Sequence, residues 1–355
     1  MKYSGPLNAT SRDLSEQLIA RIDLKSEQVY ALCELLIDPG VPISEKATLL
    51  ELLRDKGESG EEISYFAEAL LDRAIRPKID FGDRLVIDVC GTGGDRLELI
   101  NVSTTAMFIV AAAGAMVVKH GNRSITSKSG GGDVLEALGI PITSSPAQMS
   151  DCLAATGVGF LLAPLYHPAF QAIAPVRKQL AEKGIATVFN LLGPLLNPAR
   201  PAYQLVGVFS PAILEKYAAA LSRLSRKRAW VVHGEIPHGS GMDELSPMGE
   251  TMVHEVRGES LNFFHLFPDQ LGIPAPGLHE LRGGDAKHNA ECLVRILSGE
   301  DRGPRRDFVL LNAAAALVIT GLADKMQPGL RLAAELVDSG QAVDKLRAFQ
   351  AFFAN

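Results

Sequence analysis

The sequence predicts an α/β protein in which a small all-helical N-terminal domain, discontinuous in the chain, accompanies a large α/β domain with a mainly parallel central sheet. Up to about residue 75, apolar residues recur at helical spacing and no strand pattern appears. From residue 85, short β-branched runs alternate with alanine-rich helical segments, which is typical of parallel strands joined by crossover helices. The length of 355 residues exceeds that of a usual single domain and favours two.

Helix-start signals divide the N-terminal part into several short helices. Ser26 and Ser44 are each expected to cap the helix that follows, because a serine side chain accepts a hydrogen bond from a free backbone N–H at a helix start. Ser59 and Glu62 have the spacing of a capping box before the apolar segment 63–74. These signals predict helices throughout the first part of the chain.

The strand candidates begin after a boundary near residue 80. They are short apolar runs at residues 86–89, 116–118, 159–162, 206–209 and 230–232. Residues 168–187 are again helical and are expected to rejoin the N-terminal helices, and helices return from residue 283. The predicted helical domain is therefore 1–80 with about 168–187, and the α/β domain is 81–167 with 188–355.

Composition excludes several classes of protein. The formal net charge of −6 provides no basic field for a nucleic-acid partner. The most apolar run, residues 107–118, is too short to cross a membrane, and the N-terminus lacks the apolar core of a signal peptide. The four cysteines are scattered without metal-binding spacing, which fits a reducing compartment. We expect a cytoplasmic protein without a membrane segment.

A glycine-rich turn follows the first strand candidate and precedes a helix. Gly91, Gly93 and Gly94 allow backbone N–H groups to approach a ligand, and the helix start adds a positive dipole end that suits phosphate. An ordinary tight turn is the alternative. Phosphate binding is favoured by the polar residues that follow, which are Asp95, Asn101, Ser103 and Thr104. The chain has no Gly-Lys dipeptide of a Walker loop, and Arg96 occupies the last glycine position of a dinucleotide fingerprint.

A second glycine-rich loop follows the next strand candidate. It is dense in hydrogen-bond donors, namely Lys119, Asn122, Arg123, Ser124, Thr126, Ser127, Lys128 and Ser129. A solvated surface loop is the alternative. For His120 a packed or capping role is more common than catalysis, and we assign it no proton transfer. Two such loops suggest a ligand with two separate phosphate groups.

Two further features have both a functional and a structural interpretation. Asp243 and Glu244 are adjacent carboxylates that are solvated in most proteins, but magnesium often binds through one or two carboxylates and substrate phosphates. Arg177 is either an exposed helix arginine or the partner of a substrate carboxylate, and the sequence leaves this open. No nucleophile–base pair is recognised, so no residue is assigned as a catalytic acid or base.

Together these motifs resemble the anthranilate phosphoribosyltransferases of tryptophan biosynthesis. The resemblance runs from the N-terminal helices almost to the C-terminus. It is carried by an ordered series of motifs at residues 91–95, 101–104, 119–124, 133–139, 166–169, 188–195, 232–234, 243–244 and 311–315. One motif would be weak evidence, whereas the series is specific.

The resemblance implies transfer of the phosphoribosyl group of phosphoribosyl pyrophosphate (PRPP) to the amino nitrogen of anthranilate, the second step of tryptophan biosynthesis from chorismate. The implied PRPP-binding residues are Gly91, Gly94, Asp95, Asn101, Val102, Ser103, Thr104, Lys119, His120, Gly121, Asn122, Arg123, Ser124, Ile125, Thr126, Ser127 and Gly131. The implied anthranilate-binding residues are Gly91, Asn122 and Arg177. The implied magnesium ligands, for two Mg²⁺ ions per subunit, are Ser103, Asp243 and Glu244. Lys119 and these ligands would stabilise the transition state.

The resemblance also implies a homodimer joined through its helical domain, with PRPP bound between the two domains. Separate anthranilate synthase components are possible partners. Leu99, Ile100 and Gly131 depart from residues common in the family, which affects contact details more than the reaction. The competing hypotheses are a pyrimidine nucleoside phosphorylase, which would prefer a different second loop and no acidic pair, and a non-catalytic paralogue that binds nucleic acid.

Overall fold

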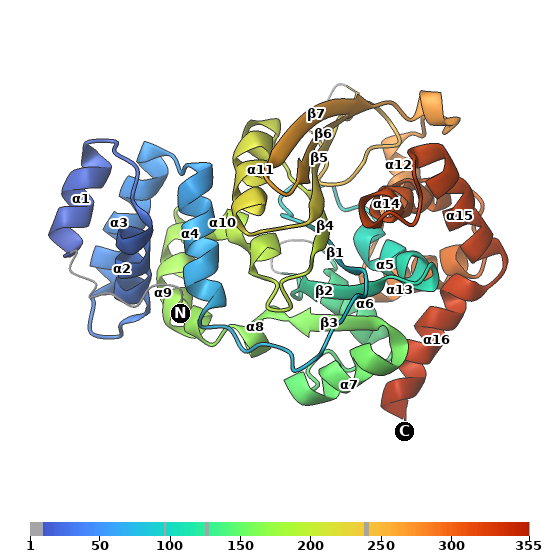
Figure 1. The fold of residues 1–355 in the computed structure, drawn as a ribbon, viewed down its shortest axis with the longest axis horizontal. Coiled ribbons are helices and arrows are strands. Elements are labelled where there is room, and N and C mark those ends of the chain that lie inside the picture. Colours follow the sequence, from blue (N-terminus) through green and yellow to red (C-terminus); the bar gives the residue numbers. More distant parts are fainter. Residues whose placement is uncertain (1–9, 96, 125–127, 238–240, 355) are drawn as a thin grey trace.

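The computed structural model describes residues 10–95, 97–124, 128–237 and 241–354. Its first part consists of four short helices, α1 (Ser11–Ile19), α2 (Ser26–Ile37), α3 (Ile43–Lys56) and α4 (Gly60–Leu71). Figure 1 shows these helices grouped at one end of the molecule, away from the central sheet.

The capping predictions for these helices hold at one position and fail at two. Ser59 accepts from the backbone N–H of Glu62 and forms the predicted capping box. Ser26 is instead the first residue of α2, because the extended Lys25 is the N-cap and its N–H is satisfied by the Gln28 side chain. Ser44 lies inside α3, which starts after Pro42, whose fixed φ suits a helix start.

The sheet has seven strands in the order β3-β2-β1-β4-β5-β6-β7. The first five are β1 (Val86–Gly91), β2 (Met116–Gly121), β3 (Val158–Leu162), β4 (Tyr203–Gly207) and β5 (Arg228–Gly234), and they pair in parallel. This confirms a mainly parallel sheet. The predicted run 206–209 was placed too late, since β4 ends at Gly207 where the backbone turns toward Phe209.

An antiparallel hairpin lies at one sheet edge and was not predicted from the sequence. It comprises β6 (Thr251–Arg257) and β7 (Ser260–Leu266), and β6 pairs antiparallel with β5. Polar residues interrupt the apolar ones along β6, and β7 is exposed over most of its length. Neither strand therefore shows the continuous apolar run of the buried parallel strands.

Helices cover both faces of the sheet, and each face has its own apolar core. On one face lie α5 (Val102–Ala112), α14 (Pro304–Thr320) and α16 (Gln341–Ala354), which pack on the parallel strands. Around them are the short helix α6 (Gly131–Ala137) and α7 (Pro146–Thr156), α12 (Leu278–Leu281), α13 (Ala286–Leu297) and α15 (Met326–Asp338). Alternation along β1 directs Ile87 and Val89 to this core.

The second core joins the opposite face of the sheet to the N-terminal helices. It includes α11 (Leu214–Arg223), which packs on β5 and also on α4. The helix α9 (Ala169–Glu182) follows α8 (Ala163–Tyr166) and packs against α2 and α3, and α10 (Phe189–Leu192) contacts α4. The two-domain division of the chain stays a prediction, supported by these packing partners. No helix within the described ranges combines the length and apolar character needed to cross a membrane.

Candidate functional site

Two loops at the carboxyl ends of β1 and β2 form the centre of the site. The first begins at Gly91 and ends at Asn101, the residue before α5. The backbone N–H of Thr92 donates to the carbonyl of Gly207 at 2.9 Å, which anchors this loop to β4. Loops at this edge of a parallel sheet are a common place for ligands because the helix that follows directs its N-terminal N–H groups there.

The second loop is closed by a single carboxylate. Asp133, in the first turn of α6, accepts from the backbone N–H groups of Ser124 and Gly130, both at 2.8 Å. A side chain at Gly131 would begin 2.7 Å from the hydroxyl of Thr104 on α5. Glycine at this position therefore lets the two loops approach each other, which gives a structural reason for one of the departures noted above.

Lys119 is the cation placed deepest between the loops. It lies at the end of β2, is 5% exposed, and donates to the carbonyl of Val89 and to the hydroxyl of Ser103, the latter at 3.1 Å. The ammonium group is thus directed from β2 toward the first turn of α5, where a phosphate would meet it.

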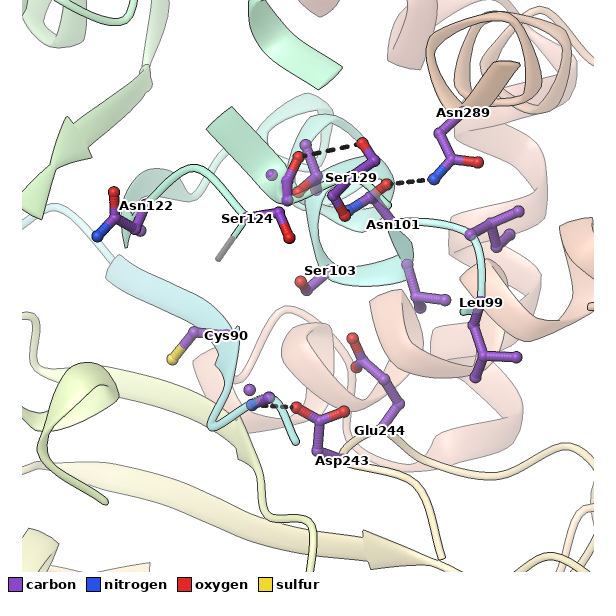
Figure 2. A pocket seen from close by; sticks show the side chains of 18 of the residues that line it. Cys90, Leu99, Asn101, Ser103, Asn122, Ser124, Ser129, Asp243, Glu244 and Asn289 are labelled. Carbon is purple, nitrogen blue, oxygen red and sulfur yellow. Dashed lines mark hydrogen bonds between the residues drawn. The ribbon is translucent and has the colours of Figure 1, made fainter. Parts of the chain in front are cut away.

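The acidic pair lies on the opposite side of the same space (Figure 2). Asp243 accepts from the backbone N–H of Gly93 at 2.7 Å, across 150 positions of sequence. Burial raises the pKa of both Asp243 and Glu244, and repulsion raises it further, from Asp95 on Asp243 and from Asp243 on Glu244. A group of half-buried acidic side chains whose charges repel one another is chemically suited to a divalent cation.

Among the described residues, no group of three or more His, Cys, Asp or Glu side chains is arranged to hold a metal ion. Asp243, Glu244 and the Ser103 hydroxyl are oxygen donors on the wall of the same cavity, and Glu244 accepts a hydrogen bond from the backbone N–H of Ser103. These residues fit an ion that shares its ligands with a substrate phosphate.

The two loops and the acidic pair enclose a cavity of about 400 Å³. Most predicted site residues line it, namely Gly91, Asp95, Asn101, Val102, Ser103, Thr104, Lys119, His120, Gly121, Asn122, Arg123, Ser124, Gly131, Asp243 and Glu244. Gly94 is not on its wall but beside Phe209. Ile125, Thr126 and Ser127 lie outside the described residues. The guanidinium of Arg123 pairs with Glu136 at 2.7 Å.

A second cavity of about 430 Å³ adjoins the first and shares six residues with it, Cys90, Gly91, Thr92, His120, Gly121 and Asn122. Its walls are largely apolar and include Phe170, Phe189 and Leu196. Arg177 of α9 lies between two aromatic rings, with its guanidinium carbon 5.8 Å from the Phe170 centroid and 5.6 Å from the Phe189 centroid. Burial lowers its pKa.

His120 lies at the junction of the two cavities as a neutral, packed side chain. Its Nδ1 is 3.2 Å from the carbonyl of Gly193, and its ring meets that of His167 edge-on. Burial, reinforced by His167, lowers the pKa of His120 to about 3. This supports the interpretation that His120 packs rather than transfers protons.

Several wall residues were missed by sequence reasoning. Glu98 pairs with Lys128 at 2.8 Å and joins the first loop to the second. Asn289 of α13 reaches the cavity from a part of the chain to which we assigned no site role. No local motif marks Asn289, so only the fold reveals its position.

A match to a protein family gives the general class of this protein. Residues 83–343 match the family described as the glycosyl transferase family, a/b domain. More particularly, the chain belongs to the anthranilate phosphoribosyltransferase family. It is 42% identical over 329 residues to the anthranilate phosphoribosyltransferase of Syntrophomonas wolfei, covering 93% of this chain and 94% of the relative.

Solved structures agree with this assignment. The Thermus thermophilus anthranilate phosphoribosyltransferase superposes with a TM-score of 0.88 at 38% identity, covering 97% of this chain and 100% of that one. The Saccharomyces cerevisiae enzyme in complex with PRPP and Mg has a TM-score of 0.85 at 28% identity, with 98% of each chain covered. The yeast enzyme is also known in complex with 4-fluoroanthranilate, with a TM-score of 0.80 at 27% identity, covering 97% of this chain and 93% of that one.

Proposed function

We propose that the chain transfers the phosphoribosyl group of PRPP to the amino nitrogen of anthranilate, giving N-(5-phosphoribosyl)anthranilate and pyrophosphate. The observation that carries this proposal is the pair of adjoining cavities at the ends of β1 and β2. One is polar and lined by two phosphate-suited loops, and the other is apolar with a single guanidinium. The ligands bound by the yeast relative support the same two substrates.

In this proposal PRPP occupies the polar cavity. The first loop, with Gly91, Gly94, Asp95 and residues 101–104, holds the pyrophosphate. Residues 119–127 and Gly131 hold the ribose and its phosphate. Backbone N–H groups at the start of α5 and the buried ammonium of Lys119 supply positive charge where the leaving group departs.

Asp243, Glu244 and Ser103 would hold magnesium, and two ions per subunit are part of the proposal. When bound, Mg²⁺ would offset the negative charge that develops on the departing pyrophosphate. The half-buried, mutually repelling carboxylates support this assignment, because a bound cation would relieve the repulsion that raises their pKa. The Mg-bound yeast relative supports it as well.

Anthranilate would enter the apolar cavity and meet Arg177 through its carboxylate, with Gly91 and Asn122 at the junction. An aromatic amine is neutral at pH 7, so the attack on ribose C1 needs no strong general base. Loss of pyrophosphate gives oxocarbenium character at that carbon. The chain therefore contributes mainly by holding the amine and C1 close together and by stabilising the leaving group.

The assembly is also part of the proposal. We infer a homodimer joined through the helical domain (1–80 with about 168–187), and a cytoplasmic location in which the four buried, free cysteines stay reduced. Separate anthranilate synthase components would supply the second substrate.

The direct test is the decrease of anthranilate fluorescence on addition of PRPP, with and without Mg²⁺. We expect PRPP-dependent loss of fluorescence that requires the ion. Phosphorolysis of thymidine without consumption of anthranilate would instead indicate a nucleoside phosphorylase, and salt-sensitive DNA binding without turnover would indicate a non-catalytic paralogue.

The metal assignment has its own test in the double variant Asp243→Ala with Glu244→Ala. Because both carboxylate donors are lost, we expect turnover to fall by roughly 10²-fold or more. Glu259→Ala, at an exposed position in the turn between β6 and β7, is the acidic control and should retain activity. Near-normal kinetics in the double variant would exclude the assignment.

A further inference from the structure

Asn289 reaches the phosphate cavity from a helix distant in sequence. It lies in the second turn of α13, is 3% exposed, and lines the same cavity as Asn101 and Lys119. Figure 2 shows its side chain directed at Asn101, with a hydrogen bond between them. The contact spans 188 positions of sequence.

The hydrogen bonds around Asn289 determine which way two amide groups face. The backbone N–H of Gly284 donates to Asn289 Oδ1 at 2.8 Å. A backbone N–H can only donate, so the Asn289 atom that faces Gly284 must be the amide oxygen. The amide nitrogen, Nδ2, therefore lies on the opposite side and acts as a donor there. Nδ2 then donates to Asn101 Oδ1 at 2.7 Å.

The Asn101 amide is oriented by its hydrogen bonds in the same way. With Oδ1 occupied by Asn289, its Nδ2 faces the other way and donates to the carbonyl of Ser129 at 3.3 Å. An amide nitrogen carries two N–H groups, so one remains for a ligand in the cavity. If the Asn101 amide were reversed, its oxygen would face the phosphate. That oxygen would also face the carbonyl of Ser129, so that two hydrogen-bond acceptors would lie against each other.

The backbone beside Asn289 is fastened to the first loop by two hydrogen bonds. Gly283 N–H donates to the carbonyl of Glu98 at 2.8 Å and Ile100 N–H donates to that of Leu281 at 3.2 Å, and together these bonds form an antiparallel bridge between Leu99 and Arg282. A side chain at Gly283 would begin 2.5 Å from Asn289 Oδ1 and 2.7 Å from the Leu99 carbonyl. Glycine therefore allows the segment 281–284 and the Asn289 amide to approach the loop together.

We propose that Asn289 is a positioning residue for diphosphate binding: it fixes the Asn101 amide so that an N–H, and not an oxygen, faces the phosphate. The inference rests on the proposed function, since it takes the polar cavity as the PRPP site. Asn289 acts through Asn101 and not by touching the reacting atoms.

The test measures binding as well as turnover. Asn289→Leu keeps the approximate volume and removes both hydrogen bonds. We expect its Kd for PRPP and for inorganic pyrophosphate, each measured by calorimetry with Mg²⁺, to rise roughly tenfold. The KM for anthranilate at saturating PRPP should change less than about twofold. Glu291→Ala, an exposed position on α13, is the matched control and should bind as the unmodified chain does.

A double-mutant cycle separates positioning from a general structural effect. In an Asn101→Ala background, Asn289→Leu should weaken pyrophosphate binding by less than about twofold, because the amide on which it acts is gone. The proposal would be overturned if Asn289→Leu weakened pyrophosphate binding equally with and without the Asn101 side chain. An unchanged Kd for pyrophosphate in the Asn289→Leu single variant would also overturn it. If Asn289→Leu does not fold, Asn289→Ser is used instead. The shorter serine side chain is expected to accept the hydrogen bond from Gly284 N–H but not to reach Asn101.

These readouts remain separate from the proposed function. Pyrophosphate binding that depends on Asn289, in a chain that does not consume anthranilate, would leave the positioning role intact and refute the transferase proposal. Turnover of anthranilate, together with a Kd for pyrophosphate that Asn289→Leu leaves unchanged, would support the transferase proposal and refute the positioning role.

Discussion

Arg177 is half-buried among aromatic rings and faces an apolar cavity, where its charge is poorly solvated. None of the ion pairs found among the described residues includes it. A guanidinium in such surroundings binds a carboxylate with two parallel hydrogen bonds more strongly than it would in water. In the proposed function, this side chain would therefore give the second cavity its selectivity for an aromatic acid.

Replacing Arg177 with alanine tests that role. Loss of a charge-assisted hydrogen bond costs about 1.5–3 kcal/mol, so we expect the KM for anthranilate to rise roughly 10- to 150-fold while the KM for PRPP changes little. Lys178→Ala, at the exposed neighbouring position, is the control. An unchanged KM for anthranilate in Arg177→Ala would remove the carboxylate contact from the proposal.

His120 predicts a pH dependence of stability. Its folded pKa of about 3 lies below the ordinary histidine value of 6.5, so the unfolded chain binds the proton more readily. The contribution of a neutral His120 is complete above pH 6.5 and is lost as the pH falls toward 3, at about 1.4 kcal/mol per pH unit. His120→Gln should show a shallower loss of stability between pH 6.5 and 4.5 in urea unfolding. The same acid slope in both proteins would contradict this assignment.

At the scale of elements, strand ends and glycines decide how closely the loops approach. Gly207 ends β4, and a side chain there would begin 1.6 Å from the carbonyl oxygen of Asp243. Gly91 at the end of β1 would meet the Asp243 carboxylate at 2.2 Å. The acidic pair can therefore lie against the first loop only because both strands end in glycine.

Gly207→Ala should disturb both stability and activity. The clash is with backbone, which cannot rotate away, so we expect a destabilisation of about 1–3 kcal/mol together with a clear loss of turnover. Thermal unfolding and the fluorescence assay report the two effects. Gly193→Ala, where a new Cβ has no atom within 4 Å, is the matched control for stability. If Gly207→Ala behaves like this control, the close approach is not required.

At the scale of the whole molecule, apolar side chains remain exposed at the helical end. Ile19, Ile22 and Ile43, in or beside α1 and α3, are 67%, 56% and 45% exposed. Figure 1 shows these helices far from the sheet and its ligand cavities. Exposed apolar side chains at this end favour burial against a second copy, in line with the proposed homodimer.

The double variant Ile19→Glu with Ile22→Glu tests this arrangement. Because charges would be buried without partners, we expect the mass in solution to fall from twice the 38.0 kDa chain mass to that of one chain. Sedimentation measures it directly. Leu261→Glu, exposed on β7 and away from α1 and α3, should leave the assembly unchanged. A dimer that survives the first variant would place the interface elsewhere.

Local sequence is sufficient to predict the elements that depend on neighbouring residues. The capping box of Ser59 and Glu62, the five parallel strands and the two glycine-rich loops all follow from local spacing and residue type. The hairpin of β6 and β7 was not predicted, because its partly exposed strands lack the continuous apolar run that is typical of a buried strand. Family motifs then linked the loops to PRPP, since such motifs combine local geometry with a particular chemistry.

Contacts between residues far apart in the sequence become visible in the folded chain alone. Asp243 reaches the first loop across 150 positions, and Asn289 reaches Asn101 across 188. No local pattern encodes such contacts, because they result from the packing of whole strands and helices on the sheet. The orientation of the Asn101 amide depends on that packing, since its partner comes from a helix that the chain forms almost two hundred residues later.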